Sequence, residues 1–232
     1  MPSGKPDFSR VIACRCTKEE SAKEHQSRLL RESGLDLPLL KSMTFDKFDP
    51  NRINLPEQRE NLEMVYEAAL NFAKSPEGWL VLQGETGCGK THLAAAIGNY
   101  QLQAGKPVKF VEVPNFLDHL RSTFSPESAV SYDQLFEEVK NTPLLILDDF
   151  GEHSTTPWAQ EKLYQLINYR YNAHLATVIT TRLTTDEIAS PIVSRFFDNN
   201  LSTVLEIRVP DYRTDHTHKS SQTPKRRSKK ER

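Results

Sequence analysis

One string of eight residues constrains the fold of this chain more than any other feature. The string is Gly84, Glu85, Thr86, Gly87, Cys88, Gly89, Lys90 and Thr91. It fits the pattern G-x-x-x-x-G-K-[ST] without a mismatch, and it lies between an apolar, strand-like segment (79–83) and a helical segment (91–103). Glycines permit a tight turn that points backbone N–H groups at polyphosphate. The string therefore predicts a nucleotide-binding loop; the alternative is a glycine-rich turn with a chance lysine.

The residues of this loop have distinct expected roles. The positive end of the helix that follows points at the same place as the loop amides. We expect Lys90 to bridge the β- and γ-phosphates and the Thr91 hydroxyl to bind Mg²⁺. Cys88 lies next to these amides and to Lys90, so we expect its thiolate to be favoured and a bulky thiol reagent to block nucleotide binding.

Two carboxylates follow the most apolar segment of the chain. Residues 144–147 are four aliphatic residues in a row, and Asp148 and Asp149 come directly after them. Ligands of open parallel sheets bind beyond the carboxyl ends of the strands. We therefore expect Asp148 to bind Mg²⁺, through water, and Asp149 to polarise the attacking water. An Asp pair alone is more often a turn or a cap, but beside a phosphate loop the metal-site interpretation is favoured.

Strand-like and helical segments alternate from residue 56 onward. After an amphipathic helix at 56–72, strands are expected at 79–83, 108–111, 144–148, 176–180 and 204–207, and helices at 91–103, 115–124 and 158–171. Short uninterrupted apolar strands separated by helices are typical of a parallel sheet covered on both faces. The predicted fold class is therefore α/β, and we expect Trp158, Tyr164 and Leu166 to lie in its core.

Length and charge divide the chain into three parts. Its 232 residues suffice for one domain of ordinary size with short tails. We expect a flexible or helical N-terminal segment at 1–40, the folded domain at 41–213 and a disordered basic tail at 214–232. Residues 219–232 carry seven basic residues and one acidic residue, so the rest of the chain has a net charge of −7. Three interpretations of the basic run 225–230 stay open: contact with nucleic-acid phosphates or an acidic partner, a solvated tail, and a nuclear signal.

Features that the sequence lacks bear on location and metal content. No apolar run approaches the roughly 20 residues that cross a bilayer, and the first residues lead into no apolar stretch of signal-peptide length. We therefore expect a cytoplasmic protein without membrane contact. The odd number of cysteines, three, agrees with a reducing compartment. Cys14 and Cys16, even with His25, supply fewer than the four ligands of a structural zinc site, so we predict no zinc.

Five segments carry a resemblance to a known family. They are residues 44–48, 87–94, 147–151, 163–171 and 177–181. Together they resemble the AAA+ ATPases of the DnaC/DnaI helicase-loader group, with the IstB transposition helpers as close relatives, over roughly residues 40 to 213. The phosphate loop is generic to NTPases, whereas the GKTHLA and LDDxG strings are more specific. The resemblance implies an AAA+ P-loop ATPase domain with a mostly parallel sheet, which binds and hydrolyses ATP with Mg²⁺, and it places His92 among the nucleotide-binding residues.

The resemblance also assigns roles to residues near the end of the domain. Arg195 lies where the family has an arginine that completes the ATP site of a neighbouring subunit; a surface arginine on a helix is the alternative. The C-terminal helical lid of the family is expected to be abbreviated here, with Arg213 as the candidate for the arginine that reads the γ-phosphate. Arg182 replaces the usual Asn that orients the attacking water, and a guanidinium donates but cannot accept. We therefore expect slow or altered hydrolysis, with Thr181 as a possible substitute.

The function that the resemblance implies is the loading of a replicative ring helicase onto single-stranded DNA during replication initiation. The expected partners are the replicative helicase, single-stranded DNA and, with ATP bound, further copies of the chain. Two alternatives stay open. One is an IstB-like transposition helper that binds duplex DNA with ATP, and the other is a nucleotide-dependent binding module with negligible hydrolysis, which Arg182 suggests.

Overall fold

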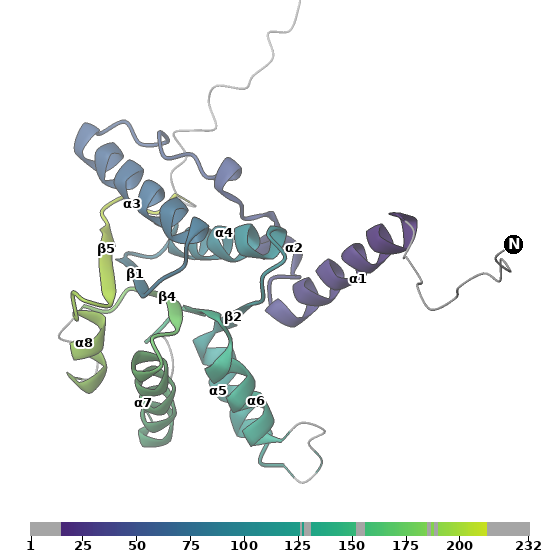
Figure 1. Ribbon diagram of the computed structural model, residues 1–232. Coiled ribbons are helices and arrows are strands. Elements are labelled where there is room, and N and C mark those ends of the chain that lie inside the picture. The colour runs from purple at the N-terminus through teal and green to yellow at the C-terminus, as the bar shows by residue number, and fades with distance from the viewer. Residues whose placement is uncertain are drawn as a thin grey trace, which may run out of the picture.

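Five parallel strands form the centre of the molecule in the computed structural model, which describes residues 15–125, 127, 131–151, 156–184, 187 and 190–212 (Figure 1). The strands are β1 (Trp79–Gly84), β2 (Val108–Glu112), β3 (Leu144–Asp148), β4 (Ala176–Thr181) and β5 (Ser202–Ile207). Their order across the sheet is β2-β3-β4-β1-β5, and every neighbouring pair is parallel. The carboxyl ends of β1, β3 and β4 therefore meet at one edge.

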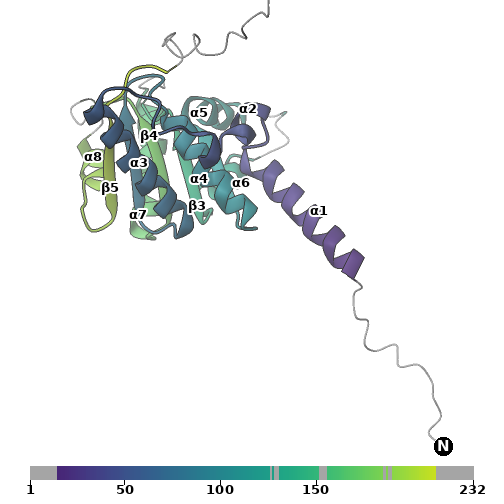
Figure 2. The ribbon, with the colours of Figure 1, turned by 90° about the horizontal axis from the view of Figure 1, so that it is seen from above.

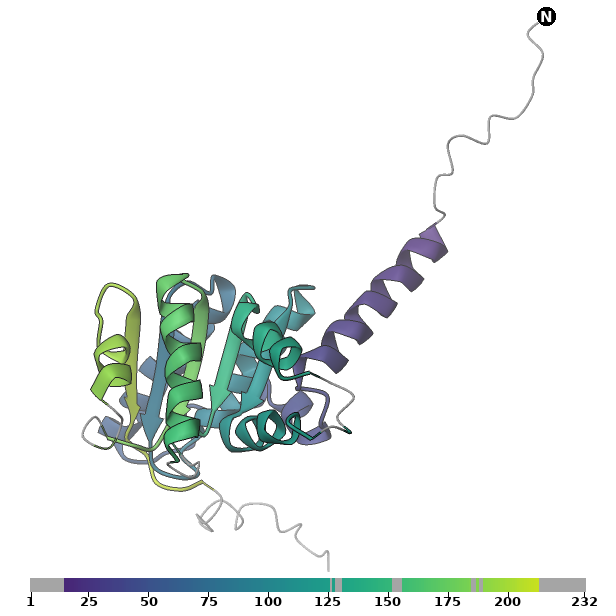
Figure 3. The same cartoon turned by 90° about the horizontal axis from the view of Figure 1, so that it is seen from below.

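Helices cover both faces of this sheet. One face carries α2 (Pro38–Ser42), the short 3₁₀ helix η1 (Phe45–Lys47), α3 (Pro56–Lys74) and α4 (Lys90–Gln103), and the other carries α5 (Val113–Ser122), α6 (Tyr132–Asn141), α7 (Pro157–Asn172) and α8 (Ser190–Phe196). Figure 2, from above, shows α3 and α4 in front of the sheet, and Figure 3, from below, shows α5 to α8 in front of it. The predicted α/β class with a parallel sheet covered on both faces is confirmed.

The strands alternate between two apolar layers because successive side chains point to opposite faces. In β1, Leu80 and Leu82 pack toward α3 and α4, whereas Trp79 and Val81 pack toward α7 and α8. The amphipathic helix expected at 56–72 is α3, whose buried face consists of Leu62, Val65, Ala69 and Ala73. Both faces of β1 are thus shielded from water, which explains its uninterrupted apolar sequence.

The first helix, α1 (Arg15–Ser33), projects from the body and contacts it at its C-terminal end (Figures 2 and 3). There Leu29 and Leu35 are buried, and the ammonium of Lys109 on β2 donates to the carbonyl of Glu32 at 2.9 Å. In the described part of the chain, no helix is both long and apolar enough to cross a membrane.

The helix α7 shows which sequence expectations succeed and which fail. Thr156 caps it, since its hydroxyl accepts from the N–H of Ala159 at 3.2 Å, and Leu166 is buried. Trp158 is partly buried against the same apolar layer. The prediction that Tyr164 lies in the core is wrong: it is 38 % exposed, because it lies on the flank of α7, outside the buried stripe that includes Leu163 and Leu166.

The sequence pattern did not predict two of the helices on the face of the sheet that α5 to α8 cover. They are α6 and α8. Ser131 is the N-cap of α6, since its hydroxyl accepts from the N–H of Gln134 at 3.2 Å. The helix buries Phe136 and Val139. The expected disordered tail at 214–232, the basic run within it and Cys14 all lie outside the described residues.

Candidate functional site

The loop between β1 and α4 is shaped by glycines in conformations that other residues avoid. Gly87 has φ +74° and Gly89, the residue before α4, has φ +113°. A Cβ atom on Gly87 would collide with the carboxylate of Asp211, and one on Gly89 would lie 2.9 Å from Cε2 of Phe48. Two segments distant in sequence therefore press against the loop at positions where only glycine fits.

Lys90 begins α4 and turns its ammonium back onto the loop. The side chain is buried, and Nζ donates to the carbonyls of Gly84 at 2.7 Å and Glu85 at 2.8 Å. Carbonyl oxygens partner an ammonium as phosphate oxygens do, so the cation is already held at the mouth of the loop. A bound phosphate can exchange with these carbonyls as its partner.

A buried carboxylate lies beneath the same loop. One oxygen of Asp148 accepts from the hydroxyl of Thr91 at 3.1 Å, and the other accepts from the hydroxyl of Thr180 at 2.6 Å. Burial raises the pKa of Asp148 to about 6, and the nearby charge of Asp149 adds to this rise. A hydroxyl and a carboxylate this close form the kind of oxygen donor set that Mg²⁺ prefers, so Thr91 and Asp148 fit the metal role predicted for them.

The loop opens into a cavity of about 570 Å³ at the carboxyl edge of the sheet. Its lining includes Lys90, Thr91, His92, Asp149, Arg182 and Tyr212. Asp149 adopts φ +53°, and its N–H donates to the hydroxyl of Thr180 at 3.0 Å, which holds the residue at the rim. The structure thus brings the predicted lysine, threonine and second aspartate to one hollow of a size that accepts a small molecule.

His92 occupies the side of the cavity that faces residues 44–48. One ring nitrogen lies 3.0 Å from the carbonyl of Thr44, and the ring packs edge-on against Phe48 at 5.2 Å between centroids. Burial lowers the pKa of His92, which favours the neutral imidazole at neutral pH. The residue therefore shapes the cavity without adding charge.

The expectation that Cys88 has a favoured thiolate is wrong. The side chain is fully buried, and burial raises the pKa of its thiol even though Lys90 and Arg52 lie nearby. Desolvation of a thiolate outweighs the attraction of the two cations here. Ready modification of Cys88 in the folded protein is not expected, so a thiol reagent is not expected to block nucleotide binding.

The residues assigned by resemblance alone lie in different surroundings. Thr181 is buried, and its hydroxyl donates to the carbonyl of Phe150 at 2.8 Å and accepts from the N–H of Leu183 at 3.0 Å. Arg182, by contrast, is exposed at the cavity. Arg213 lies outside the described residues, although Tyr212 just before it donates its N–H to the carbonyl of Gly87 at 3.1 Å.

Arg195 lies on α8 and is held by α7. Its guanidinium donates to the side-chain oxygen of Asn168 at 2.5 Å and lies over the rings of Tyr164, at 5.2 Å, and Tyr171, at 5.5 Å. These contacts place the guanidinium in an aromatic setting on the far side of β1 from α4. Its role in a neighbouring subunit stays a prediction.

Sequence reasoning missed Arg52. This residue follows η1, is 8 % exposed and lines the cavity, and its Nη2 donates to the carbonyl of Cys88 within the phosphate loop at 2.6 Å. Its segment has no periodicity and no motif, so no signal in the sequence pointed to it.

Comparisons with known proteins agree with this architecture. The model of the IstB-like ATP binding protein family matches residues 14–221. A replicative helicase loader DnaC from Buchnera aphidicola subsp. Acyrthosiphon pisum (strain APS) is 26 % identical over 181 residues, which cover 78 % of this chain and 71 % of that protein. A replicative helicase loader DnaI from Bacillus subtilis (strain 168) is 27 % identical over 181 residues, which cover 75 % of this chain and 55 % of that protein.

The solved structures show the same fold. A crystal structure of the DnaC helicase loader matches with a TM-score of 0.62 at 22 % identity, and the match covers 74 % of this chain and 99 % of the other. This agreement confirms the predicted fold, a parallel sheet covered by helices on both faces with the phosphate loop after β1. Since the family model spans most of the chain, the protein belongs to the IstB-like ATP binding protein family, within which it resembles the DnaC/DnaI helicase loaders.

Proposed function

We propose that this protein is an ATPase that loads a replicative ring helicase onto single-stranded DNA. It binds ATP with Mg²⁺ in the cavity above the phosphate loop. While ATP is bound it holds the helicase, and it releases the helicase when ATP is hydrolysed to ADP and phosphate. The observation that carries the nucleotide role is the cluster of Thr91, Asp148 and Lys90 at one edge of the sheet. The names of the two relatives compared above, both replicative helicase loaders, support this function over that of a transposition helper.

The chain's own residues divide the chemistry. Lys90 exchanges its loop carbonyls for phosphate oxygens, and Thr91 and Asp148 are the residues that would hold the metal. When bound, Mg²⁺ offsets charge on the β- and γ-phosphates. Asp149, at the rim of the cavity, accepts a proton from the attacking water or orients it.

The position of Arg182 favours slow hydrolysis. Its guanidinium lines the cavity and can donate to a phosphate, but it cannot accept a hydrogen bond from the attacking water. The hydroxyl of Thr181, which already has two backbone partners, offers little help. A module that signals mainly by binding ATP, with very slow turnover, is therefore the second candidate function.

Assembly supplies the remaining part of the proposed site. Arg195 of one copy is proposed to complete the ATP site of another, so that ATP-bound copies associate. The contacts with Asn168, Tyr164 and Tyr171 hold its guanidinium in one place, which lowers the entropy cost of using it.

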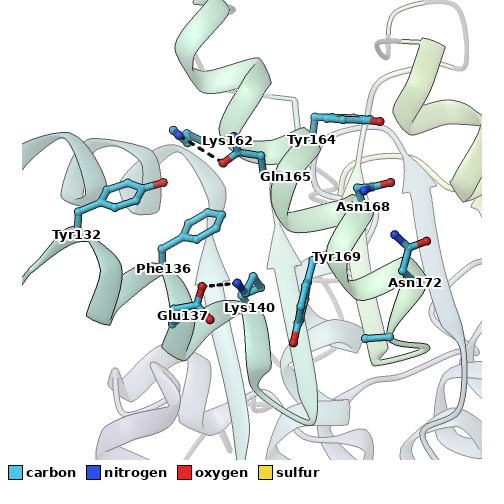
Figure 4. Close-up of a pocket in the computed structure, with 11 residues that line it drawn as sticks. Tyr132, Phe136, Glu137, Lys140, Lys162, Tyr164, Gln165, Asn168, Tyr169 and Asn172 are labelled. Carbon is cyan, nitrogen blue, oxygen red and sulfur yellow. Dashed lines mark hydrogen bonds and ion pairs between the residues drawn. The ribbon is translucent and has the colours of Figure 1, made fainter.

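A groove between α6 and α7 is the proposed contact surface for single-stranded DNA. It has a volume of about 710 Å³, and Figure 4 shows rings and ammonium groups from both helices facing one another across it. Lys140 Nζ lies 4.5 Å from the ring centre of Tyr169, and Lys162 Nζ lies 5.4 Å from that of Tyr132. Rings that stack bases, next to cations that meet phosphates, are the usual means of binding single strands. Glu137 and Glu161 pair with these lysines, so the expected affinity is modest.

The loading function predicts an ATP-dependent complex. The full chain mixed with the replicative helicase from the same source at micromolar concentration should form a complex with ATP that native mass spectrometry detects. Lys90→Ala should abolish it, because the loop loses the cation that meets the phosphates. Lys106→Ala, an exposed lysine beyond the end of α4, serves as the matched control and should behave like the parent. If the parent chain forms no complex with ATP present, the loading function is wrong.

The burial of Asp148 predicts that its charge lowers the stability of the protein at neutral pH, although the proposed hydrolysis needs it. Its folded pKa of about 6 exceeds the ordinary 3.8, so its contribution to stability is present below pH 3.8 and is lost as the pH rises through about 6. Asp148→Asn removes the buried charge and can keep both threonine partners. It should therefore raise the free energy of unfolding at pH 7.5 by up to about 3 kcal/mol in urea titrations, while Mg²⁺-dependent hydrolysis is lost.

The increase in the free energy of unfolding that Asp148→Asn produces should become smaller as the pH falls from 7.5 toward 4. Asp118→Asn, whose side chain is exposed on α5, should change stability by less than about 0.5 kcal/mol. A less stable Asp148→Asn protein at pH 7.5, or a gain that does not vary with pH, would show that the carboxylate is not strained by burial.

The proposed DNA groove predicts that a substitution on its face of the sheet weakens DNA binding, whereas a substitution on the opposite face does not. Tyr169→Ala should weaken binding of labelled oligo-dT by about 5- to 100-fold in fluorescence anisotropy with ATP, since one stacking platform is removed. Tyr100→Ala, a comparably exposed tyrosine on α4 across the sheet, should leave binding unchanged. Equal affinity of the Tyr169→Ala protein and the parent would move the DNA site elsewhere.

A further inference from the structure

Arg52 reaches the phosphate loop from a segment 36 residues earlier in the chain. Its Nη2 donates to the carbonyl of Cys88 at 2.6 Å. The guanidinium also lies over the ring of Phe48 at 5.1 Å and that of Tyr212 at 4.6 Å. The side chain is thus almost fully buried between Phe48, the phosphate loop and Tyr212.

The hydrogen bond to Cys88 controls the direction of the next N–H group. The described chain has no cis peptide, so the Cys88 carbonyl and the Gly89 N–H point in opposite directions across their shared peptide plane. While Arg52 holds the carbonyl, the N–H of Gly89 is directed away from Arg52. Gly89 is the N-cap of α4, so this N–H is one of the helix-terminal donors without an intrahelical partner.

The packing at Gly89 shows that this arrangement is tight. A Cβ atom there would lie 2.9 Å from Phe48 and 3.3 Å from Nη2 of Arg52. The aromatic ring and the guanidinium therefore press directly on the backbone of the loop, and the peptide has little room to rotate. Gly89 is thereby required both for its φ of +113° and for the approach of Arg52.

Charge adds to the effect of the hydrogen bond. Burial lowers the pKa of Arg52, but an arginine stays protonated at neutral pH. A positive charge fixed beside the loop, in the lining of the same cavity, favours the binding of an anion there, and low local dielectric strengthens this attraction.

We propose that Arg52 is a positioning residue for the nucleotide: by holding the Cys88 carbonyl, it aims the Gly89 N–H at the phosphates. This inference rests on the proposed binding of ATP at the same loop. The ligand part concerned is the polyphosphate, so the effect of Arg52 depends on phosphate groups and does not depend on the base.

Replacement of Arg52 separates this role from a contact with the base. In calorimetric titrations of the full chain with Mg²⁺, Arg52→Met should weaken the binding of ATP and ADP by about tenfold or more and leave that of adenosine unchanged. Arg52→Lys keeps the charge but loses the planar fork of donors, so it should fall between the parent and Arg52→Met. Arg59→Met is the matched control, because Arg59 also donates to a backbone carbonyl, that of Ile53 at 3.1 Å, but outside the loop.

The possible results are distinct. Equal affinities of Arg52→Met and the parent for ATP would overturn the inference and leave the proposed function intact. A loss that is the same for ATP and adenosine would assign Arg52 to the base instead. If Arg52→Met does not fold, as judged by circular dichroism, the ratio of ATP to adenosine affinity in Arg52→Lys decides, and an unchanged ratio overturns the inference. A parent chain that binds no nucleotide overturns both proposals.

Discussion

The hydrogen bonds of the Asp148 carboxylate join three elements at the edge where ligands of parallel sheets bind. Thr91 brings the start of α4, Thr180 brings β4, and Asp148 itself ends β3. Because β4 lies between β3 and β1, these bonds also fix the distance from the carboxylate to the phosphate loop at the end of β1. The cost is a desolvated carboxylate whose pKa is raised to about 6, and a bound cation would relieve it. The centre of the site is thus built for a partner with positive charge.

The phosphate loop is held from outside as well as from within. Lys90 donates to two of its carbonyls, Arg52 donates to a third, and the N–H of Tyr212 donates to a fourth. With its carbonyls engaged, the loop keeps its remaining N–H groups for an anion. Such preorganisation lowers the entropy cost of binding, because the backbone does not have to rearrange when phosphate arrives. Segments before α3 and after β5 therefore belong to the site as much as the loop does.

The sequence pattern predicts those parts of the molecule that are determined by residues close together in the chain. The eight-residue loop, the aliphatic strand that ends in Asp148 and the helix expected at 158–171 each follow from neighbours in sequence. Arg52 and the burial of Cys88 could not be predicted, because both depend on segments that meet only in the fold. Tyr164 failed for a related reason: its apolar ring suggested the core, but its position on α7 turns it outward. The helix α6 has a Ser131 cap and a buried face of Phe136 and Val139, so its sequence does contain a helix signal.

The loop and the buried carboxylate beneath it together form the proposed site for a magnesium nucleotide. Calorimetric titration of ATP into the purified full chain, with and without Mg²⁺, tests this claim most directly. We expect saturable heat of binding and an affinity for ATP that is higher with Mg²⁺ than without it. Lys90→Ala should give no heat of binding. An absence of heat in the parent chain, or equal binding by Lys90→Ala, would contradict it.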